Sequence, residues 1–273
     1  MSPLFIVLLI AGYFAALIVI ARITGRKNSN ADFFLGGRKS PWYVVAFGMI
    51  GASLSGVTFI SVPGWTGTSQ FSYMQMVLGY LPGYLVVAFV LLPLYYRMQL
   101  TSIYTYLEGR FGVRAYKTGA SFFLLSRIVG ASFRLFLVAI VLQLAVFEKL
   151  DVDMPFVFTV LITISLIWLY TFRGGIKTII WTDTLQTAFM LLAVGMSVYS
   201  ISDSLGFTTA EMITAVKESE YSQIFFFGDA DDPRFFFKQF FAGMFITITM
   251  TGLDQDMMQK NLSCRNLRDA QKN

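Results

Sequence analysis

The chain has 273 residues, of which 56% are hydrophobic and only 14% are charged. Soluble domains carry about 25% charged residues, so this composition excludes a water-soluble globule. Histidine is absent and Cys264 is the single cysteine, which excludes histidine general bases, imidazole-bound metals and an internal disulfide.

Seven apolar stretches are long enough to cross a membrane as helices, which takes about 20 residues. In chain order they cover residues 3–21, 41–66, 71–96, 118–147, 154–172, 178–201 and 235–258. The first has neither a basic leader nor a small-residue cleavage site, so we expect it to remain as a span and not to be removed as a signal peptide. The pattern predicts an all-α polytopic membrane protein.

The loops between these stretches alternate in charge. Lysine and arginine gather after the first, third, fifth and seventh stretches, whereas the loops after the fourth and sixth are acidic. Because basic loops stay in the cytoplasm, we expect a multi-pass protein of the cell membrane with its N-terminus outside and residue 273 in the cytoplasm. The net charge of +5 is then explained by topology, and we expect the lipid bilayer as a partner but no nucleic acid.

The middle of the second stretch contains Gly51, Ser53, Ser55, Gly56 and Thr58 in an otherwise apolar segment. Small residues of this kind let a neighbouring helix approach closely. They also mark helices that unwind inside the membrane, where the freed backbone carbonyls take a partner such as a bound cation. Composition alone leaves both interpretations open.

The seventh stretch repeats this pattern. Thr247, Thr249 and Thr251 alternate and therefore cannot share one face of a helix, and Gly252 offers a break before two carboxylates. Transporters with inverted repeats place discontinuous helices at corresponding positions of their two halves. The second and seventh stretches are five apart, and this pairing favours a broken helix at both positions.

Asp183, Arg127 and Arg134 are further ionisable residues inside apolar stretches. Asp183 is near the start of the sixth, where a helix N-terminus would stabilise an acid and give it a purely structural role. Arg127 and Arg134 are seven residues apart on one face of the fourth. They either pair with Asp254 and Asp256, or one of them binds an anionic solute.

The spacing of the two carboxylates bears on this choice. Two residues apart on a helix, Asp254 and Asp256 would point about 200° from each other. At most one would then reach the arginine face, which leaves one guanidinium in need of an anion. We therefore expect Arg134, nearer the centre of its span, to bind a carboxylate-bearing solute and Arg127 to be structural.

Four motifs of the chain carry a resemblance to a known family. They are Asp32-Phe33-Phe34-Leu35-Gly36-Gly37-Arg38-Lys39-Ser40-Pro41-Trp42, the stretch Ser53–Phe59, Trp181-Thr182-Asp183-Thr184-Leu185-Gln186, and Gly252-Leu253-Asp254-Gln255 followed by Gln259-Lys260. Together they resemble the sodium:solute symporter family, whose members include sodium–glucose, proline and sialate carriers. The resemblance implies a LeuT-like fold, in which two inverted five-helix repeats follow an extra N-terminal helix.

On this resemblance residues 1–273 form a single transmembrane domain. Residues 1–40 hold the extra helix and a cytoplasmic loop, 41–206 the first repeat, 207–234 an extracellular loop, and 235–273 the first helix of the second repeat with a cytoplasmic loop. The second repeat is incomplete, so we expect the chain to be the N-terminal part of a longer, bacterial protein.

The resemblance also implies the site residues of a sodium-coupled symporter. Sodium would bind the backbone carbonyls of Gly51 and Leu54, with Asp183 near the inner sodium route and further ligands beyond Asn273. The implied solute contacts, to which Arg134 is added on the charge argument above, are Ser53, Ser55, Gly56, Thr58, Thr247, Met250 and Thr251. No cofactor is expected besides the coupling ion.

The sequence departs from the sugar-carrier pattern at Val57, Thr58, Thr247 and Met250, and Ser53 replaces the aspartate of the proline carriers. We therefore expect import of a small polar or anionic solute by alternating access. A symporter-like sensor domain, fused to a signalling module such as a histidine kinase, would share every one of these residues and stays an open alternative. An enzyme is disfavoured, because no nucleophile lies beside a base.

Overall fold

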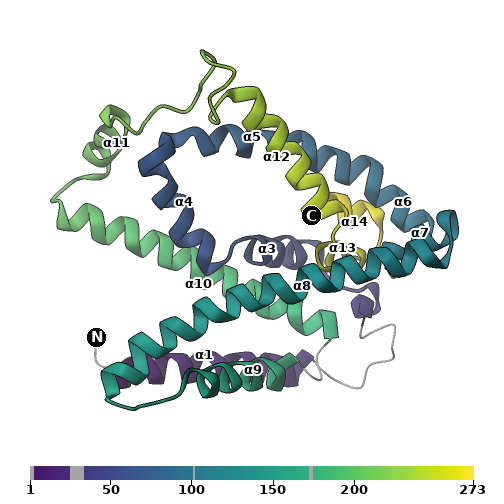
Figure 1. Cartoon of the computed structure of the whole chain (residues 1–273), viewed down its shortest axis with the longest axis horizontal. Helices are drawn as coiled ribbons and strands as arrows, with labels where there is room; N and C mark the ends of the chain where they lie inside the picture. Colours follow the sequence, from purple (N-terminus) through teal and green to yellow (C-terminus); the bar gives the residue numbers. More distant parts are fainter. Residues whose placement is uncertain (1–2, 25–33, 101, 172–174) are drawn as a thin grey trace. The chain divides into compact units, whose positions relative to one another are not determined.

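The computed structural model describes residues 3–24, 34–100, 102–171 and 175–273, so Asp32 and Phe33 of the first motif lie outside the described residues. The elements in chain order (Figure 1) are α1 (Pro3–Thr24), η1 (Gly36–Arg38), α3 (Trp42–Ser53), α4 (Gly56–Ser69), η2 (Gln70–Ser72), α5 (Tyr73–Val86), η3 (Val87–Leu91), α6 (Leu92–Arg97), α7 (Tyr104–Phe111), α8 (Val113–Leu142), η4 (Gln143–Phe147), η5 (Glu148–Leu150), α9 (Phe156–Thr171), α10 (Gly175–Ser204), α11 (Thr209–Glu218), α12 (Phe236–Thr247), η6 (Ile248–Gly252), α13 (Gln255–Leu262) and α14 (Leu267–Lys272).

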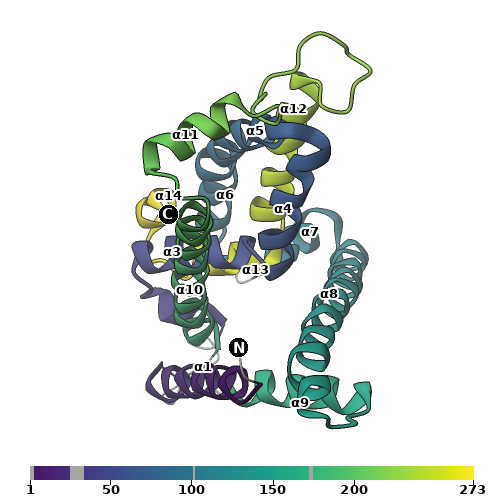
Figure 2. The same ribbon diagram turned by 90° about the vertical axis from the view of Figure 1, so that its left-hand side faces the viewer.

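These helices form two compact units. The first contains Met1–Arg38 and Thr101–Thr182, and the second contains Lys39–Leu100 and Asp183–Asn273, so that α10 contributes to both. Within the first unit α8 packs against α7 and α9, and α1 packs against α9. Within the second unit α5 lies beside α12 (Figure 2), and both α13 and α14 pack against α3.

The predicted stretches are largely helical, but within the described residues fewer than seven helices are long and apolar enough to cross a membrane. The described residues contain four such helices, namely Leu4–Thr24, Gly56–Arg97, Val113–Leu142 and Gly175–Ser204, and the bent pair Phe236–Gly252 with Gln255–Leu262 makes up to five. The second and fifth stretches yield the shorter apolar helices α3 and α9, of 12 and 16 residues. α3 is short because the second stretch breaks in its middle.

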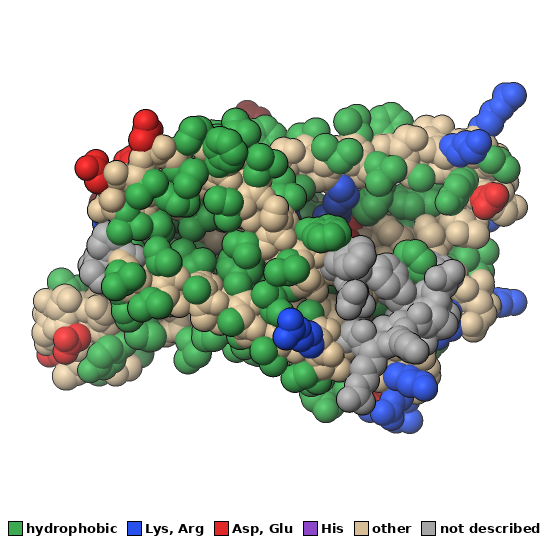
Figure 3. Space-filling model, turned by 90° about the horizontal axis from the view of Figure 1, so that it is seen from below, with side chains coloured by type: hydrophobic (Ala, Val, Ile, Leu, Met, Phe, Trp, Pro, Cys, Tyr) green, Lys and Arg blue, Asp and Glu red, His purple; other side chains and the backbone are tan. Residues whose placement is uncertain are grey.

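The outward side chains of these helices are mostly apolar. Leu4, Phe122 and Tyr199, on three different helices, are each more than 60% exposed. Hydrophobic side chains also cover most of the face drawn in Figure 3, where charged ones are sparse. Exposed apolar surface on this scale marks contact with lipid or with further protein.

The closest helix crossing in the second unit depends on three glycines. A Cβ atom on Gly79 of α5 would overlap the carbonyl oxygen of Phe240, and one on Gly243 of α12 would overlap that of Met76. A Cβ atom on Gly83 would lie 2.7 Å from the Met244 carbonyl oxygen. Small residues let the backbones of two membrane helices touch, and these glycines do so for α5 and α12.

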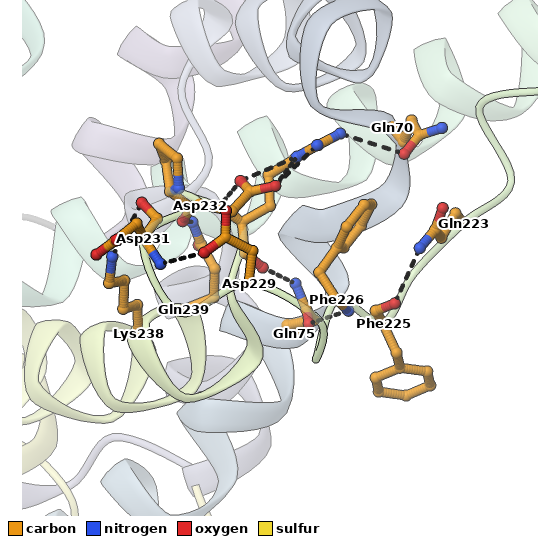
Figure 4. A network of polar contacts seen from close by, with 12 residues as sticks. Gln70, Gln75, Gln223, Phe225, Phe226, Asp229, Asp231, Asp232, Lys238 and Gln239 are labelled. Atoms are coloured by element: carbon orange, nitrogen blue, oxygen red, sulfur yellow. Dashed lines mark hydrogen bonds and ion pairs between the residues drawn. The ribbon is translucent and has the colours of Figure 1, made fainter.

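A loop between α11 and α12 is fastened to the start of α5 (Figure 4). Gln75, fully buried, donates from Nε2 to the Arg234 carbonyl (2.8 Å) and accepts at Oε1 from the Phe226 N–H (3.1 Å). Gln70 donates to the Glu220 carbonyl (2.7 Å). The Arg234 guanidinium lies 4.5 Å from the Phe226 ring centre and bonds Asp232, and this bonding lowers the pKa of the Asp232 carboxyl.

We expect Gly79→Ala to lower the free energy of unfolding by about 1–3 kcal/mol, the usual cost of overpacking, because the obstructing atom belongs to the backbone. Thermal unfolding of the purified protein in detergent measures this. Gly67→Ala in α4 is the matched control, since its added Cβ would meet no atom within 4 Å. Equal losses in the two variants would contradict the close crossing.

Candidate functional site

The second predicted stretch is a broken helix. α3 ends at Ser53, and the backbone is extended at Leu54 (φ −83°, ψ 125°) and Ser55 (φ −118°, ψ 165°) before α4 begins at Gly56. Ser55 Oγ accepts a hydrogen bond from the Thr58 N–H (3.3 Å) and lies 3.1 Å from Thr58 Oγ1. The break predicted here is confirmed, and Ser55 and Thr58 form the capping box that begins α4.

Close helix packing, the other interpretation left open by the sequence, holds for Gly51. A Cβ atom there would overlap Thr187 Oγ1 of α10 and lie 2.8 Å from the Asp183 carbonyl oxygen. Thr187 Oγ1 also lies within hydrogen-bonding distance of the Phe47 carbonyl (2.9 Å), and Gln186 Nε2 donates to the Gly51 carbonyl (3.3 Å). Close packing therefore holds at Gly51 and the helix break at Leu54 and Ser55, whereas cation binding at the break stays a prediction.

The seventh stretch breaks as well. α12 continues as η6 to Gly252, and the helix axis then turns by 65° into α13. Asp254 is the N-cap of α13, because its Oδ1 accepts from the N–H groups of Asp256 (3.0 Å) and Met257 (3.2 Å). Tyr95 of α6 donates its hydroxyl to the Gly252 carbonyl (3.0 Å).

A cavity of about 750 Å³ lies against the two breaks within the second unit. Of the predicted site residues, Ser53, Leu54 and Thr251 line it. The lining as a whole is mostly apolar and consists of Ala46, Met49, Ile50, Ser53, Leu54, Leu81, Tyr84, Leu85, Val87, Ala88, Phe89, Leu92, Thr251, Asn261, Ala270, Gln271, Lys272 and Asn273. Its size suits a small organic solute.

The other predicted solute contacts are not among these lining residues. Ser55, Gly56 and Thr58 begin α4, whose first turn the Ser55–Thr58 pair caps. Thr247 is buried and donates to the Gly243 carbonyl (3.0 Å), whereas Met250 is 59% exposed. Their roles as solute contacts stay predictions.

The two predicted arginines belong to the first unit. Arg134 is exposed on α8, and the Arg127 guanidinium lies 5.3 Å from the centre of the Phe123 ring. The argument that assigned them assumed two helical carboxylates, and this assumption is wrong for Asp254. As the N-cap it lies before the helix and bonds the backbone of α13, while Asp256 Oδ2 lies 3.9 Å from Lys260 Nζ.

Asp183 forms a buried ion pair that the sequence analysis missed. Its Oδ2 accepts from Lys260 Nζ at 2.8 Å, and the two side chains are 18% and 4% exposed. The structural role proposed for Asp183, an acid at a helix N-terminus, is wrong, because α10 begins at Gly175 and the effect of the dipole is confined to the first turn. The available signal was Lys260 itself, a lysine close to Met257, Met258 and Leu262 on one short helix.

The carbonyl of Leu54 is placed differently from that of Gly51. Within the described residues no hydrogen bond to the Leu54 carbonyl is formed, and the residue lines the cavity. Carbonyl and carboxylate oxygens are the ligands that hard cations prefer. At the break the Leu54 carbonyl is therefore without a hydrogen bond from any described residue, whereas the Gly51 carbonyl accepts from Gln186.

Comparisons with known proteins agree with this geometry. The family model described as the sodium:solute symporter family matches residues 33–267. A sodium/sialic acid symporter of Aliivibrio fischeri is 31% identical over 66% of this chain and 35% of its own length, and one of Proteus mirabilis is 32% identical over 64% of this chain and 34% of its own. The chain thus spans about a third of the length of these curated relatives.

A solved structure shows the same fold. It is the substrate-bound, outward-open state of a Na⁺-coupled sialic acid symporter, with a TM-score of 0.77 and 24% identity. The match covers 95% of this chain and 53% of that one. It confirms the all-α, polytopic, LeuT-like fold class predicted from the sequence.

We expect Lys260→Met to destabilise the protein by about 3–5 kcal/mol, because it leaves the Asp183 carboxylate buried without its partner. Asp256→Asn is the matched control. It removes a more distant carboxylate that is 45% exposed, so its cost should stay below about 1 kcal/mol.

The double variant Asp183→Asn/Lys260→Met should recover much of the loss, because neither remaining side chain carries a bare charge. Thermal unfolding of the wild type, Asp183→Asn, Lys260→Met and the double variant gives the coupling energy of the pair. Additive losses would show that the pair does not stabilise the fold.

Proposed function

The chain belongs to the sodium:solute symporter family, and from this premise we propose that the protein couples the import of a small polar or anionic solute to sodium by alternating access. The observation that carries the proposal is the cavity beside two broken helices, lined by Ser53, Leu54 and Thr251. Discontinuous helices at corresponding positions of two repeats are how secondary transporters build such sites. The relatives named above are transporters, so the sensor alternative gains no support.

Sodium in this proposal binds at the first break. The Leu54 carbonyl supplies one ligand, and the Gly51 carbonyl supplies another. Asp183 lies near the route of the ion, although its carboxylate is paired with Lys260. An ion bound here would stabilise the conformation that binds solute, and linkage then requires the solute to favour the ion by the same factor.

The proposed solute bears a carboxylate. The two relatives named above carry sialic acid, which supports an acidic solute. Ser53 and Thr251 offer hydroxyls at the cavity wall; Ser55, Gly56, Thr58, Thr247 and Met250 flank the two breaks.

The contact with the carboxylate is assigned to Arg134 from the sequence alone, because a guanidinium readily forms two parallel hydrogen bonds to such a group.

The direct test is uptake into proteoliposomes by the protein expressed from its complete reading frame. An inward sodium gradient should drive uptake of a labelled carboxylic acid, and a potassium gradient of the same size should not. Small carboxylates should compete with the labelled solute. Competition by neutral sugars alone would refute the acidic solute.

Arg134→Lys tests, in the same uptake assay, whether Arg134 and not Arg127 binds the solute. A lysine keeps the positive charge but cannot form the bidentate fork, so the variant should lose most of its solute affinity. Arg127→Lys is the matched control one heptad away on the same helix, and its affinity should be unchanged.

We propose that the 273 residues form one transmembrane domain of the cell membrane, with the N-terminus outside and residue 273 in the cytoplasm. The alternating loop charges support this orientation. A single cysteine placed in residues 218–232, in a Cys264→Ser background, should react with an impermeant thiol reagent in intact cells. One placed in 104–116 should react only after the cells are opened, and the reverse pattern would overturn the orientation.

A further inference from the structure

Three side chains on about one turn of α10 reach the backbone carbonyls of α3. Thr184 Oγ1 donates to the Val44 carbonyl (3.2 Å), Thr187 Oγ1 lies 2.9 Å from the Phe47 carbonyl oxygen, and Gln186 Nε2 donates to the Gly51 carbonyl (3.3 Å). All of these contacts lie within the second compact unit. α3 is therefore fastened to α10 at three successive levels.

The contact at Gly51 differs from the other two because of where α3 ends. In a continuous helix the Gly51 carbonyl would accept from the N–H of Ser55, four residues later. The break directs this N–H to Thr58 Oγ1 instead (3.4 Å). The Gly51 carbonyl is thus one of the orphaned carbonyls at the end of a helix, and the Gln186 amide takes the place of the missing donor.

The same oxygen is the one to which the proposed function assigns sodium. An amide N–H and a sodium ion both present positive charge to the oxygen, so at close range they repel each other. Gly51 has little freedom to turn away, because the space beside its Cα is filled by Thr187 Oγ1. The Gln186 side chain is half-buried and has three rotatable bonds, so it is the group that can withdraw.

We propose that Gln186 is a positioning residue of the sodium site, which satisfies the Gly51 carbonyl and must be displaced when sodium binds there. The inference rests on the proposed sodium-coupled function. Because sodium must replace this hydrogen bond, the Gln186–Gly51 contact weakens the affinity of the site for sodium. It therefore raises the sodium concentration at which the site is half occupied.

Gln186→Met tests this inference, because methionine has a similar length and shape but no donor. With the complete protein in proteoliposomes, the sodium concentration for half-maximal uptake should fall about two- to tenfold, the effect expected from one hydrogen bond. At saturating sodium, the maximal rate of uptake should change little. The solute concentration for half-maximal uptake, measured at the same sodium concentration, should also change little. Gln186→Asn, whose shorter amide cannot reach the Gly51 carbonyl, should give the same fall and serves if the methionine variant does not fold.

Thr184→Val is the matched control. It removes a hydrogen bond between the same two helices, but to a carbonyl outside the proposed site, so its sodium half-saturation should equal that of the wild type. The inference is overturned if Gln186→Met leaves the value unchanged or raises it, or if Thr184→Val lowers it equally. Failure of the proposed function is a separate result, since wild-type uptake would then show no dependence on sodium.

Discussion

The arrangement of the second unit depends on one constraint: a helix that stops inside a membrane protein leaves backbone groups without partners, and there is little water to supply them. At each break, nearby side chains form hydrogen bonds with these backbone groups. Ser55 and Thr58 cap α4, and Asp254 caps α13. Gln186 and Tyr95 donate to carbonyls on the opposite sides, at Gly51 and Gly252. Leu54 lines the cavity, and its carbonyl has no such partner among the described residues.

α10 connects one half of each broken helix, α3 and α13. Its hydroxyl and amide groups bond the backbone of α3, and Asp183, directly before Thr184, binds Lys260 of α13. Each hydrogen bond contributes little to stability. Removing only one side chain of the buried ion pair is costly, because the other charge is left without its partner. α3 and α13 are thereby fixed to the same helix, whereas the other halves, α4 and α12, have other neighbours. α12 packs on α5 through glycines, and the loop before it is fastened by Gln75.

Much of this could be predicted from the sequence. Apolar length and loop charge gave the membrane class, and glycine, serine and threonine at mid-span indicated both breaks. The capping role of Asp254 was missed, because the prediction placed Asp254 within the helix, although an aspartate just after a break is a common N-cap. Pairings across the fold were not readable: nothing near Asp183 in the chain indicates Lys260, and nothing near Gln75 indicates Phe226 and Arg234. Such partners are set by how helices pack, which a single sequence without homologues does not reveal.

The central claim is that the carbonyls at the first break bind the coupling ion and that Gln186 yields to it. Cryo-electron microscopy of the complete protein, in sodium chloride and separately in choline chloride, tests this most directly. In sodium we expect density for an ion between the Gly51 and Leu54 carbonyl oxygens, with the Gln186 amide turned away. In choline this density should be absent and the Gln186–Gly51 hydrogen bond present. An unchanged Gln186–Gly51 bond in both maps, with no ion density at the break, would contradict the claim.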